Sequence, residues 1–566
     1  IGKNDDKVIT HDTYRGIRSH FWAHNGRNVL YVQDKGGDEN YHVYSVDTKT
    51  MDVKDLTPFE NVRAMVTATD PNHPNEILVS INNRDPQLHD VYRVDLASGQ
   101  RTLIEENTQG FLGYQADNNL DLRVAFKSDR AGGMLMMVRD NPDSAWRNFQ
   151  KVGIEDALST GPVGFAANNK TLYVTSSIGS NTSQLREVDL ADGAERVIAY
   201  DETYDVGGTL IHPTKHHVQA VSFNRQRRTW DVVDKSVEAD FAALAKVRDG
   251  DFSITDRDHA DRTWIVAYTM DDGPVYYYAW DRPTQKATLL FSNRKELESV
   301  KLSKVKPVSF KADDGMKIYG YLTTPPGVEA KNLPTVLFVH GGPWYRDSWG
   351  YNPVIQWLAN RGYAVLQVNF RGSTGYGKDY LNAADREWGG KMHQDLIDGV
   401  NWIVKKGIAD PKKVAIMGGS YGGYATLVGM TFTPDVFCCG VDIVGPSNLI
   451  TFMNTIPPYW KPWESIWFKR VGDPKTEPEF LMSRSPVTKI DRIKNPLLIG
   501  QGKNDPRVNV EESRQMVEGM KKAGKDVEYV EYADEGHGFA RPENRLDFFA
   551  KSEKFLAKHL GGRYEQ

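Results

Sequence analysis

The N-terminal half of the chain alternates short apolar or aromatic runs with polar turns. From about residue 21 to residue 297 these runs are separated by clusters of Asp, Asn and Gly, and a helical period is almost absent. Alternation of this kind, broken by turn residues at close intervals, is typical of half-buried β-strands. We therefore predict that residues 1–300 form an all-β domain.

A unit made of an apolar strand, a polar turn and a strand that ends in a Val-Asp type step recurs through this half. The units begin near residues 20, 64, 110, 161, 206 and 253, so successive starts lie 44, 46, 51, 45 and 47 residues apart. A repeat of this size, with sequence for four strands in each unit, is typical of β-propeller blades. We predict six to seven blades, the seventh built partly from residues 1–19 or truncated away. An array of β-sandwiches is the structural alternative.

The pattern changes near Val305, where strand-length apolar runs begin to alternate with amphipathic segments of helix length. Such alternation predicts that residues 301–566 form a mostly parallel, eight-stranded sheet with helices on both faces. The predicted strands are residues 308–311, 317–323, 335–340, 364–369, 413–417, 440–444, 496–500 and 528–532. The predicted helices include residues 394–405, 421–430, 510–523 and 545–559.

Composition agrees with two globular domains and excludes several kinds of partner. The chain has 566 residues, and a single core tends to stop growing at about 250–300 residues. Its net charge of −5 supplies no basic excess for binding a nucleic-acid backbone. No apolar run approaches the roughly 18–20 residues that a membrane helix needs. We expect a soluble protein that binds neither nucleic acid nor a membrane, and we leave a homo-oligomer open.

The only two cysteines, Cys438 and Cys439, are adjacent in the sequence. This arrangement excludes a disulfide framework and a Cys-rich metal site. A chain with only two cysteines fits both the cytoplasm and the periplasm. The compartment therefore stays open. The first residue is Ile1 and not Met, which leaves open that a signal peptide or other N-terminal sequence precedes it.

A nucleophile motif stands in the second half. Residues 418–423 read Gly-Gly-Ser-Tyr-Gly-Gly, directly after a predicted strand and before a predicted helix. Gly-x-Ser-x-Gly in this context presents the serine on a strained turn at the carboxyl edge of the sheet of an α/β-hydrolase, where small neighbours relieve crowding. We predict that Ser420 is a catalytic nucleophile.

A serine nucleophile needs an imidazole base that is itself held by a carboxylate. In the α/β-hydrolase order the acid follows the serine and the histidine comes last, each on a loop after a later strand. Asp505 and His537 occupy those loops. Asp442 is the reserve for the acid, whereas Asp534 and Glu535 are expected to be solvated. His340 competes as the base, but it precedes the serine, so we interpret it as a structural loop residue.

The transition state of acyl transfer carries an oxyanion that backbone amides stabilise. One donor is the amide after the nucleophile, here Tyr421, and the other comes from a glycine-rich loop after an early strand. Residues 341–343 read Gly-Gly-Pro after such a strand, and we select Gly342. No cofactor or metal is expected, because His216 and His217 lack further ligands and the glycines at 372–377 precede no clean helix.

Several other residues carry two interpretations each. Glu105 and Glu106 could anchor a peptide N-terminus, although a solvated pair on a blade edge is the preferred interpretation. Six aromatic residues are either the lining of a substrate pocket or ordinary core, and they are Trp344, Tyr345, Trp460, Trp463, Trp467 and Phe468.

A propeller followed by an α/β-hydrolase resembles the prolyl oligopeptidase family of serine peptidases, in its acylaminoacyl-peptidase and dipeptidyl-peptidase branch. The motifs that carry the resemblance are His-Gly-Gly-Pro at 340–343, Asn-Phe-Arg-Gly-Ser at 369–373, the serine motif, Asp-x-Arg at 505–507 and Gly-His-Gly at 536–538. The resemblance implies the triad and oxyanion donors given above. It also implies that Arg507 binds a peptide carbonyl or terminus and that the propeller admits only short peptides.

The resemblance has two departures and leaves two rival functions. The Asp-Trp-x-x-Glu-Glu type signature that binds a free peptide amine is not evident, which puts strict dipeptide release in doubt. We also expect the chain to be one blade short at its N-terminus, which leaves the route of substrate entry open. We expect a serine peptidase that hydrolyses short peptides or N-acylated aminoacyl substrates through an acyl-enzyme. An esterase with the same mechanism and a non-catalytic propeller scaffold are the rivals.

Overall fold

The computed structural model describes residues 7–565, and its internal contacts divide the chain into two units. The first unit comprises Ile1–Glu202, Thr209–Val218 and Ile456–Lys469, and the second comprises Thr203–Gly208, Gln219–Thr455 and Arg470–Gln566. The domain boundary expected at 300/301 does not coincide with this division and stays a prediction.

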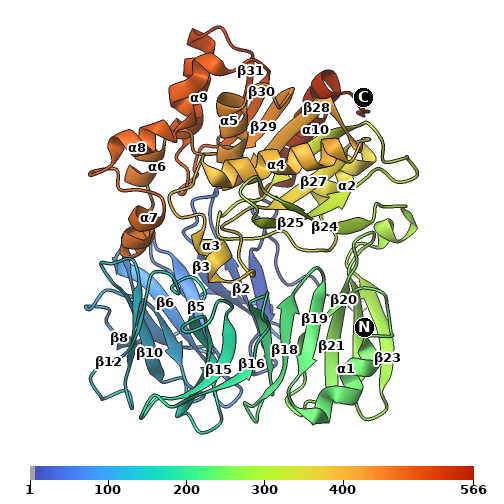
Figure 1. The fold of residues 1–566 in the computed structure, drawn as a ribbon. Helices are drawn as coiled ribbons and strands as arrows, with labels where there is room; N and C mark the ends of the chain where they lie inside the picture. The colour runs from blue at the N-terminus through green and yellow to red at the C-terminus, as the bar shows by residue number, and fades with distance from the viewer. Residues whose placement is uncertain (1–6, 566) are drawn as a thin grey trace. The chain divides into compact units, whose positions relative to one another are not determined.

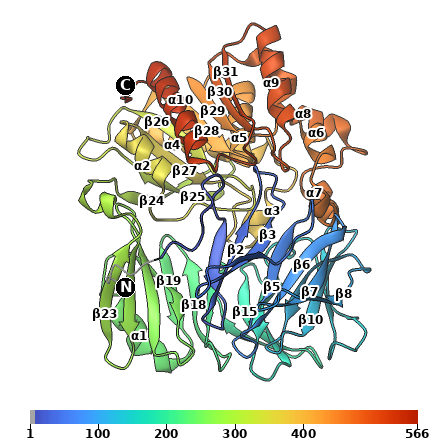
Figure 2. The same cartoon turned by 180° about the vertical axis from the view of Figure 1, so that it is seen from behind.

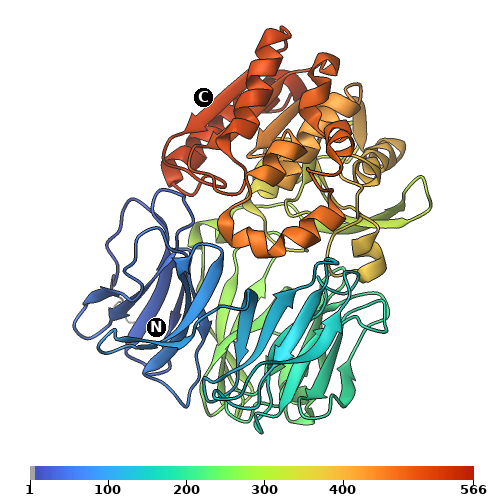
Figure 3. The same cartoon turned by 90° about the vertical axis from the view of Figure 1, so that its left-hand side faces the viewer.

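The first unit holds four antiparallel sheets of four strands, each a simple meander. Figures 1 and 3 show them in blue to cyan. The first two contain β1(Ser19–Trp22), β2(Asn28–Gln33), β3(His42–Asp47) and β4(Val53–Asp55), then β5(Ala64–Ala68), β6(Glu76–Asp85), β7(Leu88–Asp95) and β8(Arg101–Glu105). The next two contain β9(Phe111–Ala116), β10(Leu122–Ser128), β11(Met134–Val138) and β12(Arg147–Val152), then β13(Gly161–Phe165), β14(Thr171–Ser176), β15(Gln184–Asp189) and β16(Glu195–Ala199).

Two further sheets complete the six-bladed propeller predicted from the repeat. The fifth has three strands, β17(Val206–Ile211), β18(Val218–Asn224) and β19(Arg228–Val232), and the sixth has four, β20(Asp251–Arg257), β21(Thr263–Thr269), β22(Tyr276–Asp281) and β23(Lys286–Ser292). The six blades begin at residues 19, 64, 111, 161, 206 and 251, within two residues of the predicted starts. Residues 7–18 contain no strand, and residues 1–6 of the predicted seventh blade lie outside the described residues.

The fifth blade departs from the prediction of four strands per unit. After β19 the chain forms the 3-10 helix η1(Lys235–Val237) and the helix α1(Glu238–Leu244) in place of a fourth strand. The physical reason is composition, because four of the eight residues 238–245 are alanine, the strongest helix former. The side chain of Asp234 caps η1 by accepting a hydrogen bond from the amide of Ser236.

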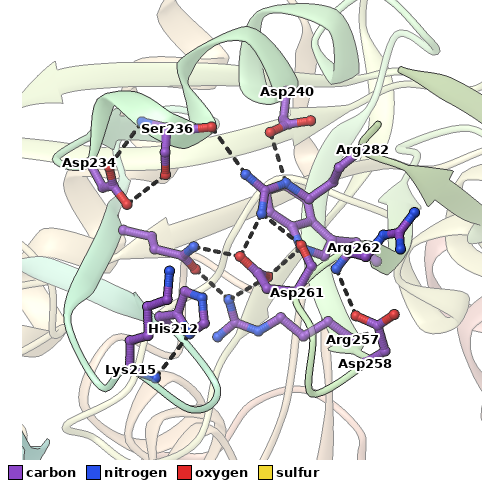
Figure 4. Close-up of polar contacts among 12 residues, drawn as sticks. His212, Lys215, Asp234, Ser236, Asp240, Arg257, Asp258, Asp261, Arg262 and Arg282 are labelled. Carbon is purple, nitrogen blue, oxygen red and sulfur yellow. Dashed lines mark hydrogen bonds and ion pairs between the residues drawn. The ribbon is translucent and has the colours of Figure 1, made fainter. Parts of the chain in front are cut away.

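A buried polar network links the fifth blade to the sixth within the second unit (Figure 4). The Asp261 carboxylate accepts hydrogen bonds from Gln219 on β18 at 2.7 Å, from the Trp264 indole at 2.7 Å and from Arg282 at 2.6 Å. Arg282 also donates to Asp240 on α1 at 3.0 Å. Buried charges of opposite sign therefore satisfy one another here, as burial requires.

The second unit also holds the predicted eight-stranded sheet, whose strand order is β24-β25-β27-β26-β28-β29-β30-β31. The pairs from β27 to β31 are parallel, whereas β24 and β25 join antiparallel at one edge. All eight predicted strands are confirmed as β24(Val305–Lys311), β25(Lys317–Thr323), β26(Leu333–Val339), β27(Ala364–Asn369), β28(Ala409–Gly419), β29(Cys439–Ile443), β30(Leu497–Gly502) and β31(Val527–Tyr532).

Helices cover both faces of this sheet. The four predicted helices are confirmed as α4(Lys391–Lys405), α5(Tyr421–Phe432), α9(Val510–Lys522) and α10(Pro542–Leu560). Figure 1 shows α4 in front of the sheet, and Figure 2, from behind, shows α10 in front of it. Helices that the prediction did not include are α2(Pro353–Asn360), α3(Lys378–Asn382), α6(Leu449–Asn454), α7(Glu464–Arg470) and α8(Pro478–Ser483), with the 3-10 helices η2(Lys295–Ser299), η3(Pro458–Trp463) and η4(Pro486–Arg492).

The main core of the second unit lies between the sheet and two of these helices. Val336, Ala415 and Val441 of the sheet pack with Leu358 of α2 and Phe548 of α10, all of them fully buried. The near-continuous apolar strands follow from burial on both faces, which is usual for parallel sheets. This core fixes the carboxyl edge of the sheet, where the predicted site residues lie.

Among residues 7–565, no helix combines the length and the apolar composition of a membrane span.

Candidate active site

Ser420 lies in the tight connection between β28 and α5. Its backbone has φ 58° and ψ −119°, a conformation that costs energy for a residue with a side chain. The Ser420 amide donates to the carbonyl of Ile443 on the neighbouring β29 at 2.9 Å. The sharp turn therefore holds the serine at the carboxyl edge of the sheet, as the motif predicted.

The glycines around Ser420 are required by close backbone approaches. A Cβ on Gly418 would lie 2.6 Å from the Val339 carbonyl, and one on Gly422 would lie 2.1 Å from the same oxygen. A Cβ on Gly423 would lie 2.3 Å from Oδ1 of Asp442. Any side chain at these positions would push the turn away from β26 and β29, which explains the glycine pattern.

The three predicted triad residues meet at this edge. His537 Nε2 lies 2.9 Å from Ser420 Oγ, and His537 Nδ1 lies 2.7 Å from Asp505 Oδ2. An ionised carboxylate only accepts hydrogen bonds, so Nδ1 carries the proton and Nε2 accepts from the serine hydroxyl. The Asp505 side chain is fully buried and the His537 side chain is 11% exposed.

The orientation of Asp505 is fixed by its own loop. Its Oδ1 accepts from the amides of Arg507 at 2.9 Å and Val508 at 3.0 Å, which leaves Oδ2 for the histidine. Gln501 also donates to Oδ2 at 3.4 Å, and Ser513 on α9 donates to Gln501 at 2.8 Å. The sequence analysis did not identify Gln501 or Ser513, because their role depends on contacts between segments and not on a motif.

The prediction for the two acids near His537 is wrong for Glu535. Glu535 is fully buried, and its carboxylate accepts from the amides of Ala540 at 3.1 Å and Arg541 at 2.7 Å. These amides directly precede α10, so an acid here satisfies donors at the start of a helix. Asp534 pairs with Arg541 and accepts from Asn544. Glu535 thus ties the histidine loop to α10.

The two alternative triad residues hold other positions. His340 is buried, with Nδ1 2.8 Å from the Gly341 carbonyl, Nε2 3.0 Å from Ser373 Oγ and its ring stacked on Phe370. Burial lowers the pKa of His340 to about 4. Asp442 is also buried, and its Oδ1 accepts from the amide of Gly445 at 3.0 Å, while burial raises its pKa well above the usual range. Their observed hydrogen bonds are to these groups and not to the triad.

The predicted oxyanion donors flank the serine. A Cβ on Gly341 would lie 3.4 Å from the Ser420 Cβ, so this loop passes close to the nucleophile. Among residues 7–565, the amides of Gly342 and Tyr421 donate no recorded hydrogen bond. Gly342 has a φ of 125°, in the region that glycine tolerates best. Both amides are therefore available to a ligand.

Hydrogen bonds of two residues, Tyr345 and Arg346, hold the segment that follows Gly342. The buried Arg346 donates to the carbonyl of Asn224 at 2.8 Å and to the Tyr376 hydroxyl at 2.7 Å. The Tyr345 carbonyl accepts from the amide of Thr374 at 3.0 Å. These contacts lie within the second unit, and they anchor the segment that follows Gly342.

The predicted substrate-binding residues lie on these same loops. Trp344 follows the glycines, the Tyr345 side chain is 63% exposed, and Arg507 is half-buried beside Asp505. Their contacts with a peptide stay predictions.

The aromatic residues of 456–469 lie in the first unit, where Trp460 stacks on Trp467 and Trp463 packs against Met134 and Val152. Trp463 is thus a partly buried residue at the edge of a core cluster, and the choice between core and pocket lining stays a prediction for these aromatic residues.

The glutamate pair of the second blade is not simply solvated. Glu105 accepts from Arg139 at 2.9 Å and from the Trp146 indole at 3.0 Å, and its side chain is 12% exposed. Glu106 lies 3.7 Å from Arg84. The ion pair between Glu105 and Arg139 therefore links the end of β8 to the residue that follows β11 in the third blade. Among the described residues, no cluster of three or more His, Cys, Asp or Glu could hold a metal ion.

Known proteins resemble this chain over nearly its full length. The model of the prolyl oligopeptidase family matches residues 349–563. Dipeptidyl aminopeptidase BIII of Pseudoxanthomonas mexicana is 51% identical over 568 residues, covering 99% of this chain and 82% of that protein. Dipeptidyl peptidase family member 6 of Caenorhabditis elegans is 35% identical over 598 residues, covering 98% and 80%. A puromycin hydrolase structure superposes with a TM-score of 0.77 at 18% identity, covering 99% and 88%, which shows a shared fold.

Proposed function

The chain belongs to the prolyl oligopeptidase family of serine peptidases, which act on peptides, and we propose that it releases dipeptides from the free N-terminus of short peptides. Two relatives that align with nearly the whole chain are named for dipeptidyl peptidase activity. The observation that carries the proposal is the hydrogen-bonded chain from Asp505 through His537 to Ser420.

In the first chemical step Ser420 Oγ attacks the carbonyl carbon after the second residue of the peptide. His537 Nε2 accepts the hydroxyl proton, and the resulting imidazolium stays hydrogen-bonded to the ionised Asp505. The carboxylate orients the ring and stabilises its positive charge without taking the proton. The strained turn at Ser420 presents Oγ without a rotation of the backbone.

The tetrahedral intermediate places negative charge on the former carbonyl oxygen. The free amides of Tyr421 and Gly342 donate to this oxygen, and each such donor contributes about 3–4 kcal/mol in comparable sites. Collapse of the intermediate transfers the proton from His537 to the leaving amine and leaves a dipeptidyl ester on Ser420. Water, deprotonated by His537, then hydrolyses the ester and restores the hydroxyl.

Arg507 and the loop aromatics provide groups for binding the peptide. The Arg507 amide donates to the Asp505 carboxylate, so the Arg507 side chain starts from a backbone position next to the triad. Its planar guanidinium has a geometry that suits peptide carbonyl oxygens. Trp344 and Tyr345 directly follow the oxyanion loop and offer apolar surface near the reacting carbonyl. We assign these three residues to substrate binding.

Two rival substrate classes use the same constellation. Acylaminoacyl substrates carry a blocked N-terminus, and simple esters carry no peptide at all. The 51% identity to a dipeptidyl aminopeptidase favours a free amine, even though this chain lacks an evident Asp-Trp-x-x-Glu-Glu type signature. If the substrate has a free amine, the residues that bind this amine differ from those of enzymes that carry the signature.

A peptide set of graded length, with free and acetylated N-termini, tests the proposal by mass spectrometry. We expect successive dipeptides from the free peptides and no product from acetylated ones. The variant Ser420→Ala should fold and lose at least about a thousandfold in rate. Cleavage of acetylated peptides alone would support the acylaminoacyl rival, and turnover of p-nitrophenyl esters without any peptide cleavage would support the esterase.

A further inference from the structure

The strand β19 forms an unpaired edge of the fifth blade. In the other five blades the chain after the third strand returns as a fourth, whereas here it forms η1 and α1 (Figure 1). The side chains of Arg228, Thr229 and Asp231 are exposed, so this edge reaches the surface. All residues concerned belong to the second unit.

The backbone of β19 offers hydrogen-bonding groups along this edge. The Val233 amide donates to the carbonyl of Gln219 on β18, and the Arg228 amide points the other way, to the Asp251 side chain at 2.8 Å. Alternate residues of an antiparallel strand face opposite sides, so the amides and carbonyls of Trp230 and Val232 face outward. Within residues 7–565 these four groups have no recorded partner outside the β18 ladder. Such an edge is a template for another strand.

A groove of about 620 Å³ runs beside this edge. Its aromatic surface is formed by Trp230, Phe241 and Phe252, with ring centroids 5.6 Å apart for Trp230 and Phe241. The exposed Ala242 of α1 and Ala245, which directly follows the helix, also line the groove. Small residues on the helix and a groove beside an open edge leave room for an extended chain.

The charges of the groove are complementary to a peptide with free ends. Arg227 is already paired with Asp249 and Asp251, at 3.1 and 2.7 Å. Arg228 at the start of β19 and Glu238 beyond its end line the groove, and the Asp251 carboxylate, which accepts the Arg228 amide, is the acidic group near Arg228. An extended chain antiparallel to β19 would bring its C-terminal carboxylate to Arg228 and its amine toward Glu238.

We propose that β19 binds a short extended peptide as the missing fourth strand of the fifth blade, antiparallel, with its carboxylate at Arg228. The five residues of β19 span roughly 14 Å, so a peptide of about five residues matches the edge. Backbone hydrogen bonds supply affinity in this mode, and alternate apolar side chains contact the aromatic groove. Pairing with β19 of a second copy, centred on Trp230, would place Val232 opposite Arg228 and leave the guanidinium without an anion.

Hydrogen exchange of residues 228–233 tests this site in the Ser420→Ala protein, which cannot consume the probe. The probe is the peptide Val-Thr-Val-Thr-Val with free termini. Its two controls are the same peptide with a C-terminal amide, and a form in which the backbone amides that would pair with β19 are N-methylated. We expect the free peptide to slow exchange at Trp230 and Val232 by about tenfold at saturation, and the N-methylated form to have no effect. The amide should bind more weakly.

Variants of the edge distinguish this site from binding elsewhere. The variant Arg228→Glu and the variant Val232→Pro should each abolish the protection by the free peptide. Val232→Pro removes one of the outward amide donors. The control Thr229→Ala should retain the protection. Unchanged exchange of β18 in the variants shows that the blade remains folded. Absence of protection at millimolar probe, or protection that survives both variants, would overturn the proposal. The proposal would also be overturned if hydrogen exchange of residues 228–233 is already slow without the probe and becomes faster when the protein is diluted, because this result indicates pairing with a second copy of the chain. None of these results depends on the proposed peptidase activity.

Discussion

At the scale of single residues, the turn at Ser420 depends on the absence of side chains at particular glycines. Gly422→Ala would place a Cβ 2.1 Å from the Val339 carbonyl, whereas Gly419→Ala would place one 3.8 Å from its nearest neighbour, the Ile443 carbonyl. We expect Gly422→Ala to lower kcat/KM by at least about tenfold, or about 1.4 kcal/mol, and Gly419→Ala to change it by less than about threefold. Steady-state kinetics on one dipeptide anilide would measure both, and equal losses would contradict the packing argument.

His340 should make the stability of the protein depend on acid. Its pKa is about 4 in the folded chain, below the ordinary value of about 6.5, so the unfolded chain binds the proton first as the pH falls. The free energy of unfolding should therefore decrease between pH 6.5 and pH 4, by up to about 3 kcal/mol from this residue. Urea titrations should show a shallower decrease for His340→Gln, and identical pH slopes would show that His340 is protonated in the fold.

At the scale of elements, the polar network at Asp261 joins the fifth blade to the sixth. Asp261→Ala would leave the half-buried Arg282 guanidinium without one of its two carboxylates, and it would leave Gln219 without an acceptor. Breaking a buried ion pair of this kind costs about 3–5 kcal/mol. Calorimetry should therefore show a clearly lower unfolding temperature for Asp261→Ala. The matched variant Asp281→Ala, which removes an exposed carboxylate that caps Thr284, should have a small effect. A similar shift for both would argue against the network.

Elements were predictable from sequence where one periodicity dominated. The propeller repeat set the blade starts within two residues, and the apolar runs gave all eight strands of the second sheet. The helix α1 was missed because it is short and stands where five other blades place a strand, so a repeat-based prediction supplied a strand. The buried state of Glu535 was missed because its partners are amides that only the fold brings together.

At the scale of the whole molecule, the site is assembled from segments far apart in the chain. Ser420 and His537 are separated by 117 positions, and the sheet order places their loops at one edge. The meeting of the three predicted triad residues was readable from motifs, because parallel strands deliver their following loops to the same edge. The division of the chain was not readable, since residues 456–469 belong by contacts to the first unit although their neighbours on both sides belong to the second.

The central claim is that His537 activates Ser420 for attack on a carbonyl, and covalent labelling by a fluorophosphonate tests it most directly. Peptide mapping of the labelled protein should find one adduct, on Ser420, formed rapidly at neutral pH. In His537→Gln the same adduct should form at least about a thousandfold more slowly, because the hydroxyl then lacks its base. An adduct on another residue, or labelling of Ser420 at an unchanged rate in His537→Gln, would contradict the account.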